Sequence, residues 1–511
     1  MERTGRYRQL AVTIASYLAA RQQPDGSLPG PDHYGLAFCV WLWSRLHADA
    51  QAASPALRDS FASAAERSWR RLADRPPRTH GEFNAYALLS CRRELGPEPT
   101  RAVLRHIRYG RRRSANWMLL RAVCRARQSS GLRRLAGGME AASALLRCAR
   151  RGFIADRPGV RSFAYHAFCG ALLADLWGQT RWRWAGEAAV RAAHFISPFV
   201  LPNGDTLYVG RGQQQVFGYA ALLYLLEAAA LLTGRDDFRS QADLVLARLL
   251  GFQRPDGSLP LVLRPEEPLE PWSPADLPGW YSYNRYADYL PFLGCFLLKA
   301  AEPEVPPLGD VAPLTPHPDF RVHRLQRCVA VLSRPGGAST NDLAFPYVCL
   351  DGVSIFPCYG AEGNPAPEAA PLPYGVLQDG RPYPFRDRLS YRLTESGLSG
   401  ASRLAVHVRR FDFGPRGFLC RDEIEFRRAC SFSRFVVANF LLRNISPRPD
   451  GWFETRADGA SALLRLSLPA EIRPRAAVSA SGPLVALRHE REALRARPGD
   501  TLAVELEVRF P

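Results

Sequence analysis

Two kinds of apolar pattern alternate along roughly the first 300 residues of the chain. In the first kind, apolar residues recur at helical spacing with arginines between them, as in an amphipathic helix on a surface. In the second kind nearly every residue is apolar, and a helix that is apolar on all sides has to be buried. The amphipathic segments are residues 7–22, 56–73, 100–109, 132–150, 182–196 and 237–252. The apolar segments are residues 34–46, 83–92, 117–125, 163–177, 216–232 and 283–300.

This alternation of six exposed and six buried helices predicts an (α/α)6 toroid over residues 1–301, with the buried helices as its inner ring. A recurring turn supports a repeated unit, because Pro-Asp-Gly-Ser follows an amphipathic segment at residues 24–27 and again at 255–258. The inner helices of such a toroid run parallel. Their N-termini therefore share one rim.

The pattern changes after residue 301. Residues 302–316 are rich in proline and acid and are predicted to be a linker. Short alternating runs such as 327–332, 433–442 and 503–510 follow, and they predict an antiparallel β-sandwich over residues 317–511. Residues 360–384 carry many Pro and Gly and are predicted to be a long loop folded back toward the toroid. The predicted fold class is thus a multidomain α+β protein.

Composition narrows the choice of partner. The formal net charge of the 511 residues is +18, but Lys299 is the only lysine and the arginines are scattered. A nucleic-acid partner is therefore not expected, whereas a basic cleft that receives an acidic substrate is compatible with this charge. The eleven cysteines include no C-x-x-C pair and no zinc spacing. They are typical of core residues in a reducing compartment, and neither a metal nor a cofactor is expected.

The N-terminus has two interpretations. Arg3, Arg6 and Arg8 followed by an apolar stretch resemble a signal peptide. The same arrangement recurs at residues 244–260, however, so residues 1–21 are predicted to be a structural helix. No apolar run is judged long enough to span a bilayer. We expect a cytoplasmic monomer, with secretion or a periplasmic location left open.

Polar and aromatic residues gather at the predicted N-termini of the inner helices. Capping accounts for a Ser or an Asp at such positions, but not for aromatic rings beside amides and imidazoles. Aromatic platforms next to planar hydrogen-bonding groups suit a sugar chain. The candidate substrate-binding residues are His33, Asn84, Trp117, Tyr165, Gln214, Asn284, Arg285 and Tyr286.

His166 is the candidate general base. Ser162 is a plausible N-cap for the helix that follows, which places His166 one turn inside it. The partial positive charge of a helix N-terminus disfavours a protonated imidazole, and a neutral histidine at a cleft suits a general base. The alternative is a core histidine that is bonded to a backbone carbonyl.

Short motifs resemble those of polysaccharide lyases of the hyaluronate, chondroitin and xanthan lyase family and, more distantly, the heparinase II/III-like enzymes. Asn116-Trp117 resembles the family's Asn-Trp-Trp element, with Met118 in place of the second Trp. Ser162-Phe163-x-x-His166 resembles its Ser-Phe-x-Gln-His element, with Tyr165 in place of the Gln. Asn203-Gly204 followed by Gly210-Arg211 resembles its arginine segment, and residues 321–324 resemble the opening of its sandwich region.

The resemblance implies β-elimination at a uronate residue of an acidic polysaccharide. It assigns Asn116 to the substrate carboxylate and its enolate-like intermediate, Arg211 to orientation or charge stabilisation, and His166 to the role of base or of an orienting group. The family has a catalytic tyrosine nine residues after the histidine, where this chain has Asp175. Tyr283 is the first candidate to replace it, followed by Tyr219 and Tyr286.

Other classes of function remain open at this point. A glycoside hydrolase on the same fold needs two carboxylates, and Asp32 and Glu82 lie at the predicted rim. A non-catalytic glycan-binding protein would have the aromatic residues without a working base. A terpene cyclase shares Gln-x-x-Asp-Gly-Ser turns, but the chain has no Asp-rich catalytic motif.

Overall fold

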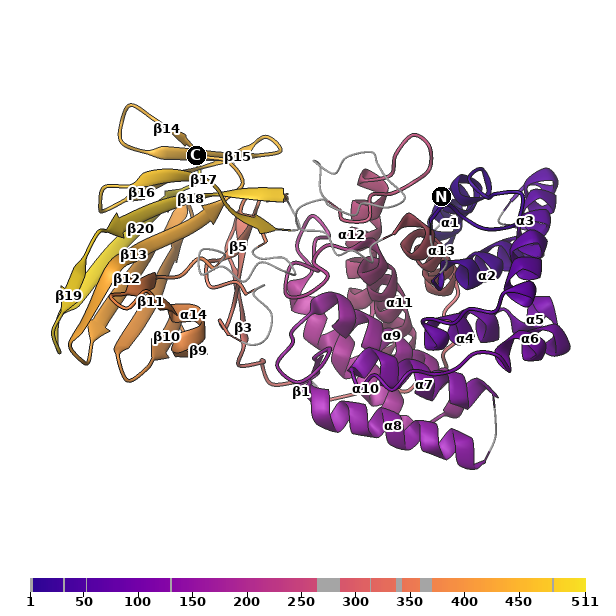
Figure 1. The fold of residues 1–511 in the computed structure, drawn as a ribbon. Coiled ribbons are helices and arrows are strands. Elements are labelled where there is room, and N and C mark those ends of the chain that lie inside the picture. The colour runs from indigo at the N-terminus through magenta and orange to yellow at the C-terminus, as the bar shows by residue number, and fades with distance from the viewer. Residues whose placement is uncertain are drawn as a thin grey trace.

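The computed structural model describes residues 3–30, 33–51, 53–128, 131–263, 285–312, 314–336, 342–358, 370–479 and 482–511. Figure 1 shows the helices gathered in one half of the molecule and the sheets in the other. The α+β class predicted from the sequence is confirmed. The last long helix ends at Ala301, and the first strand of the sheet region begins at Phe320.

The helical half contains nearly all of the helices. The long helices are α1 (Arg3–Ala19), α2 (Gly35–Ala48), α3 (Pro55–Asp74), α4 (Gly81–Ser90), α7 (Ala115–Gln128), α8 (Leu132–Cys148), α9 (Phe163–Thr180), α10 (Arg183–Ile196), α11 (Val216–Thr233), α12 (Asp236–Gly251) and α13 (Tyr286–Ala301). The short ones are α5 (Arg92–Leu95), α6 (Pro97–Leu104), η1 (Ser197–Phe199) and, among the sheets, α14 (Phe385–Arg388). A small hairpin of β1 (Ala149–Arg150) and β2 (Phe153–Ile154) follows α8.

Six of the described helices form a closed ring. Helices α2, α4, α7, α9, α11 and α13 each contact the next, and α13 contacts α2. These are the segments predicted to be apolar on all sides, and most of their residues are buried. Helices α1, α3, α8, α10 and α12 pack outside them. Helix α11 alone among the described helices is long and apolar enough to cross a membrane, and 89% of it is buried in this ring.

The predicted helix over residues 100–109 is shorter than expected. Helix α6 ends at Leu104, and residues 107–114 form an irregular loop. The carbonyl oxygens of Gly110 and Arg112 accept hydrogen bonds from the guanidinium of Arg121 instead of from helical N–H groups. These contacts hold the loop that follows the shortened helix.

Aromatic side chains fill the axis of the ring. The ring centroids of Phe292 and Phe296 are 4.3 Å apart, and Phe38 and Phe168 pack on Phe292 at 5.1 and 5.4 Å. Stacked and edge-to-face ring contacts of this kind are favourable beyond the area that they bury. The ring therefore encloses a packed core and not a channel.

Asp175 lies at the end of the ring where the inner helices terminate. Its carboxylate accepts hydrogen bonds from Tyr86 Oη at 2.5 Å and Tyr224 Oη at 2.7 Å, and it pairs with Lys299 and Arg127. Burial lowers the pKa of Lys299 to about 8, although Asp175 acts in the opposite direction. The residue at the position of the family's tyrosine thus belongs to a buried charge cluster far along the helix from the rim.

The sheet half is antiparallel throughout, as predicted. Its strands are β3 (Phe320–Arg324), β4 (Cys328–Ser333), β5 (Tyr347–Leu350), β6 (Val353–Ser354), β7 (Tyr374–Leu377), β8 (Pro382–Pro384), β9 (Ser390–Leu393), β10 (Gly397–Ala401), β11 (Ala405–Gly414), β12 (Gly417–Phe426), β13 (Cys430–Leu442), β14 (Ser446–Pro447), β15 (Phe453–Ala457), β16 (Ala460–Leu466), β17 (Glu471–Ser479), β18 (Gly482–Arg491), β19 (Leu494–Ala496) and β20 (Thr501–Arg509).

These strands form three sheets. The largest has the order β14-β15-β16-β20-β12-β11-β10-β9, the second has the order β17-β18-β13-β7-β8 with β19 also paired to β13, and the third has the order β3-β4-β5-β6. Alternate residues of β12 are buried, as expected for a sheet with one face on a core. Aromatic contacts such as Phe426–Phe435, at 6.0 Å, join the first two sheets. The prediction of a loop over residues 360–384 was wrong in part, because β7 and β8 pair within it; residues 360–369 lie outside the described ranges.

Buried polar contacts join the two halves. Asp205, in the loop before α11, accepts hydrogen bonds from Tyr347 Oη of β5 and from Tyr219 Oη of α11, both at 2.6 Å. Arg161, in the loop before α9, pairs with Asp342 at 2.7 Å. These contacts fix the sheets against the loops at the rim of the helical ring.

The predicted recurring turns are equivalent in structure. Asp25 Oδ1 accepts a hydrogen bond from the backbone N of Ser27, and Asp256 Oδ1 accepts one from the backbone N of Ser258, both at 3.0 Å.

Helix α1 packs on α13, and Tyr7 Oη donates to Glu227 at 2.9 Å. Residues 3–19 are therefore a structural helix of the ring assembly.

Candidate functional site

A cleft of about 720 Å³ lies where the inner helices begin. Every inner helix contributes a residue at or just before its first turns. The lining aromatic and imidazole rings are Tyr34, His80, Phe83, Trp117, Tyr165, Phe217 and Tyr289. Among the predicted site residues, Asn116, Trp117, Tyr165 and Arg211 line this one cleft.

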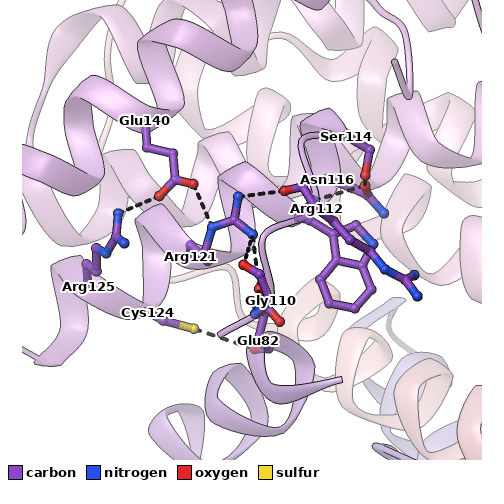
Figure 2. Close-up of polar contacts among 10 residues, drawn as sticks. Glu82, Gly110, Arg112, Ser114, Asn116, Arg121, Cys124, Arg125 and Glu140 are labelled. Atoms are coloured by element: carbon purple, nitrogen blue, oxygen red, sulfur yellow. Dashed lines mark hydrogen bonds and ion pairs between the residues drawn. The ribbon is translucent and has the colours of Figure 1, made fainter. Parts of the chain in front are cut away.

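Asn116 presents a fixed amide at the start of α7. Its Oδ1 accepts hydrogen bonds from Ser114 Oγ at 2.7 Å and from the backbone N of Trp117 at 2.9 Å. With its oxygen end occupied, the amide NH2 has no acceptor among the described residues (Figure 2). Asn116 lines the cleft, and its nitrogen is not among the fully buried atoms that lack a partner, so this NH2 is available to an oxygen of a ligand.

Arg211 is held by its backbone at the edge of the cleft. Its N–H donates to Arg161 O, and its carbonyl accepts from Ser162 Oγ. Gly210 makes this approach possible, because its φ is +80° and an added Cβ would lie 1.9 Å from Arg161 O. The Arg211 guanidinium lies 5.5 Å from the centroid of the Tyr165 ring and 3.5 Å from Asp156 Oδ2.

A buried arginine, Arg121, holds the arginine-rich loop beside Asn116. Its guanidinium donates to Glu82 at 3.0 Å and to Glu140 at 2.6 Å. The same group also donates to the carbonyls of Gly110, at 3.1 Å, and Arg112, at 2.8 Å (Figure 2). A guanidinium with four acceptors in fixed directions gives the loop a single conformation. Arg112 is thereby placed over the Trp117 ring, 4.7 Å from its centroid.

Positive charge dominates the cleft. Five arginines line it: Arg112, Arg113, Arg147, Arg157 and Arg211. Among the described residues, Asp156 is the one carboxylate in the lining. Asp156 pairs with Arg211, and the other four arginines have no ion pair among the described residues. Elsewhere many arginines do pair, for example Arg334 with Asp319. The cleft is therefore complementary to an anionic ligand.

His80 is a lining residue that the sequence analysis did not select. It immediately precedes α4 with a left-handed backbone, φ +52°, and its ring centroid is 5.6 Å from that of Trp117. Burial, and then the neighbouring His33, lowers the pKa of His80 to about 4. Its imidazole is thus neutral at neutral pH. Its place directly before the apolar helix α4 is the feature that could have pointed to it.

Asn84 and His33 both contact His80. The Asn84 amide donates to the backbone carbonyls of His33, Thr79 and His80, each at 3.1 Å, so it fixes two loops and does not bind substrate as predicted. His33 Nδ1 lies 3.2 Å from Asp288 Oδ2, and its ring is 5.1 Å from that of His80. His33 thus lies behind the lining residue and not in the lining itself.

His166 is a core residue, which corrects its predicted role at the cleft. The side chain is fully buried, its Nδ1 accepts from the backbone N of Ile154, and its Nε2 donates to Ala192 O, both at 3.0 Å. Burial lowers the pKa of His166 to about 3, so the ring stays neutral. Both ring nitrogens are hydrogen-bonded to backbone groups. His166 is therefore the core histidine bonded to a backbone carbonyl that was the alternative to a general base.

We expect His166→Ala to lower the free energy of unfolding by about 2–4 kcal/mol, since it leaves a cavity and two unsatisfied backbone groups. Turnover per folded molecule should be unchanged. Urea unfolding and activity at low temperature measure the two effects. A variant with the same free energy of unfolding as the wild type but without activity would show that His166 is catalytic after all.

Three further predictions for the rim are corrected. Gln214 is buried, and its amide donates to Asp205 at 2.8 Å and to Tyr347 at 3.1 Å. Tyr219 is fully buried and donates to Asp205. Tyr286 is buried and its hydroxyl accepts from Arg254 at 3.0 Å. These groups hold the halves and turns together and do not face the cleft.

The remaining rim candidates have different outcomes. Arg285 is the half-buried residue before α13 and is not part of the cleft lining. Tyr283, Asn284 and Asp32 lie outside the described residues. Glu82 is fully buried, and its carboxylate accepts from Arg121 and from the backbone N of Gly110, at 2.8 Å. It is therefore not available as the hydrolytic carboxylate considered above. Within the described ranges, no group of His, Cys, Asp and Glu could hold a metal ion.

Comparisons with known proteins give likenesses in structure alone. No family model matches the chain, and no curated protein matches it either. A polysaccharide lyase is similar at 12% identity and a TM-score of 0.41, over 57% of this chain and 96% of that one. A heparan sulfate lyase mutant from Pedobacter heparinus matches at 10% identity and a TM-score of 0.30, over 98% of this chain and 87% of that one. A glycosyl hydrolase of family 88 from Bacteroides vulgatus matches at 10% identity and a TM-score of 0.41, over 58% of this chain and 99% of that one.

Proposed function

We propose that the protein is a carbohydrate-active enzyme that cleaves a uronate-containing polysaccharide by β-elimination in this cleft, without a metal. The observation that carries the proposal is the juxtaposition of the free NH2 of Asn116 with Arg211 and four unpaired arginines, among aromatic rings. The similar structures are named as lyases and as a hydrolase, which leaves the reaction open. The cleft alone therefore supports the proposal.

The first requirement of the reaction is to neutralise the uronate carboxylate. The proton on C5, α to that carboxylate, is too weakly acidic to be removed while the carboxylate keeps its full charge. The amide of Asn116 donates to one carboxylate oxygen, and the guanidinium of Arg211 donates to the acid group from the other side. Both interactions strengthen as charge moves from C5 onto the carboxylate oxygens, so they stabilise the transition state more than the ground state.

The second requirement is a base and an acid. We assign the base to His80, whose imidazole is neutral at neutral pH, in place of His166. Tyr165, beneath the Arg211 guanidinium, is assigned as the group that protonates the departing glycosidic oxygen. Tyr283 stays a prediction for the same step. Stacking on Trp117 would hold the sugar ring between these groups.

A hydrolytic mechanism is the second candidate, but it has less support. Hydrolysis needs two carboxyl groups on either side of the glycosidic bond. Asp156 is the one described lining carboxylate, and it pairs with Arg211, while Glu82 is buried against Arg121. An amide beside unpaired arginines suits carboxylate binding better than acid catalysis.

The decisive experiment is incubation with a panel of acidic polysaccharides that includes hyaluronan, chondroitin, alginate and xanthan. β-Elimination leaves a C4–C5 double bond conjugated to the carboxylate, which absorbs in the ultraviolet. Saturated products on any of these polymers would instead support the hydrolase, and binding without products would support a glycan-binding protein.

The pH dependence tests the assignment of His80. Because its pKa is lowered to about 4, His80 is neutral above that pH, and kcat/KM should stay level down to about pH 5 and fall below it. His80→Gln should lower kcat/KM about 100-fold or more. His106→Gln, on an exposed histidine just after α6, is the matched control. An acid limb near the ordinary histidine pKa, or full activity in His80→Gln, would exclude His80 as the base.

A further inference from the structure

The outer helix α8 exposes four of its five large apolar residues and buries small ones, while Leu145 is partly buried against the core. Its buried positions are Gly137, Ala141, Ala144 and Cys148. Its exposed large residues are Leu132, Leu135, Met139 and Leu146, which are 84%, 56%, 69% and 87% exposed. A surface helix of a globular protein normally directs its large apolar residues to the core. Helix α8 has the opposite arrangement, with most of its large apolar residues on the solvent side.

These four side chains are the most exposed large apolar groups in the described part of the chain. The others, Leu57, Trp184 and Leu244, are scattered and only 36–39% exposed. Spacings of three, four and seven residues put the four on one face of α8. In Figure 1 this helix lies along the lower edge of the helical half, with no element beyond it. A continuous apolar stripe of this kind marks an interaction surface.

Close packing prevents α8 from turning this stripe inward. An added Cβ on Gly137 would lie 3.1 Å from Ala122 O, and one on Gly138 would lie 2.7 Å from the ring of Trp182. Leucine side chains have no room where only glycine fits. The exposure of the stripe is therefore built into the packing of α8 against its neighbours.

The charges beside the stripe are positive. The basic residues of α8 and the hairpin after it are Arg133, Arg134, Arg147, Arg150 and Arg151. Arg134 donates to Gln179 O and Arg151 to Pro316 O, whereas the other three are exposed and have no ion pair among the described residues. Glu140 is the one acidic residue of α8, and it is paired with Arg121 and Arg125. If two copies met through this stripe about a twofold axis, the same arginines would face each other. An anionic surface complements them instead.

We propose that α8 docks the protein on an anionic membrane surface. Its leucines enter the boundary between headgroups and acyl chains, and its arginines lie at the headgroup phosphates. The helix lies in the plane of the interface and does not span the bilayer. This inference does not depend on the reaction proposed for the cleft, because the apolar stripe lies on the outer helix. Arg147 of α8 also lines the cleft, so the variants below replace only residues of the stripe.

Vesicle flotation tests the proposal on the full chain. The wild type should bind vesicles of phosphatidylcholine with phosphatidylglycerol, should bind less in high salt, and should not bind phosphatidylcholine alone. Leu132→Gln, Leu135→Gln and Leu146→Gln combined should lower the partition coefficient on the order of tenfold or more, since three apolar side chains no longer insert. Leu57→Gln with Leu244→Gln, on α3 and α12, is the matched control and should bind as the wild type does.

Three results would overturn the proposal. The first would be a wild type that does not bind the anionic vesicles. The second would be a triple variant that binds them as well as the wild type, because charge alone would then account for binding. The third would be a wild-type dimer in sedimentation velocity that the triple variant converts to a monomer, with no vesicle binding by either, which would assign the stripe to a second copy of the chain.

Discussion

Asn116→Ala is expected to lower kcat/KM on an acidic polysaccharide by about 100- to 1,000-fold, the usual effect of removing one donor to a developing oxyanion. Asn116 lines the cleft, and its oxygen is fixed by Ser114 and by the backbone of Trp117. The amide is therefore already oriented, and its NH2 can donate to a ligand in the cleft without a change of the side-chain conformation. The initial rate of ultraviolet-absorbing product gives the measurement.

Asn116→Asp is the matched control for shape. It keeps the size of the side chain but sets a carboxylate against the carboxylate of the substrate, so it should be at least as inactive as Asn116→Ala. Thermal unfolding should show that both variants fold. An alanine variant within tenfold of the wild type would remove Asn116 from the mechanism.

Asp175→Ala is expected to cause the largest loss of stability. The substitution leaves Lys299 and Arg127 buried without their counter-charge and removes the acceptor of two tyrosine hydroxyls. Breaking a buried pair in this way costs about 3–5 kcal/mol. The unfolding of the helical half, followed by circular dichroism in urea, measures it. Asp236→Ala, which removes an exposed partner of Arg239, should change stability by less than about 0.5 kcal/mol.

The acid response of Asp175 has the same origin. Burial alone would raise the pKa of Asp175, but Lys299 and Arg127 lower it, and the net direction is down. A carboxyl whose pKa is lowered on folding stabilises the protein above its unfolded pKa, near 3.8, and that contribution is lost as the pH falls through the folded value. Asp175→Ala should therefore flatten the acid limb of stability. A loss below about 1 kcal/mol at neutral pH would contradict the cluster's structural role.

Much of the architecture followed from the sequence. Segments that are apolar on all sides, such as residues 216–232, could only be buried helices, and alternating runs such as residues 503–510 could only be half-buried strands. The predicted element at residues 100–109 fails in part: the helix ends at Leu104, and the loop after it is held by Arg121 of the next helix through the carbonyls of Gly110 and Arg112. Periodicity contains no information about such a contact.

The candidate site was predictable in kind but not in detail. Trp117 and Tyr165 were selected because polar and aromatic groups begin the inner helices, and Asn116 and Arg211 because of the resemblance to polysaccharide lyases. All four line the cleft. Gln214 and Tyr219 begin an inner helix too, yet Asp205 and the sheet half hold them in the core. Which rim groups stay free depends on partners from the other half of the chain.

Hydrophobic periodicity and helix starts are local properties, so most of the helices, the strands and the polar rim could be predicted from the sequence. Which rim side chains line the cleft depends on the packing of the whole fold. Tyr165 and His166 are adjacent, but successive residues of a helix point about 100° apart. Tyr165 therefore lines the cleft, while His166 turns to the carbonyl of Ala192 on α10. The direction of each side chain about the axis of α9 was set by packing against neighbouring helices, which no local pattern encodes.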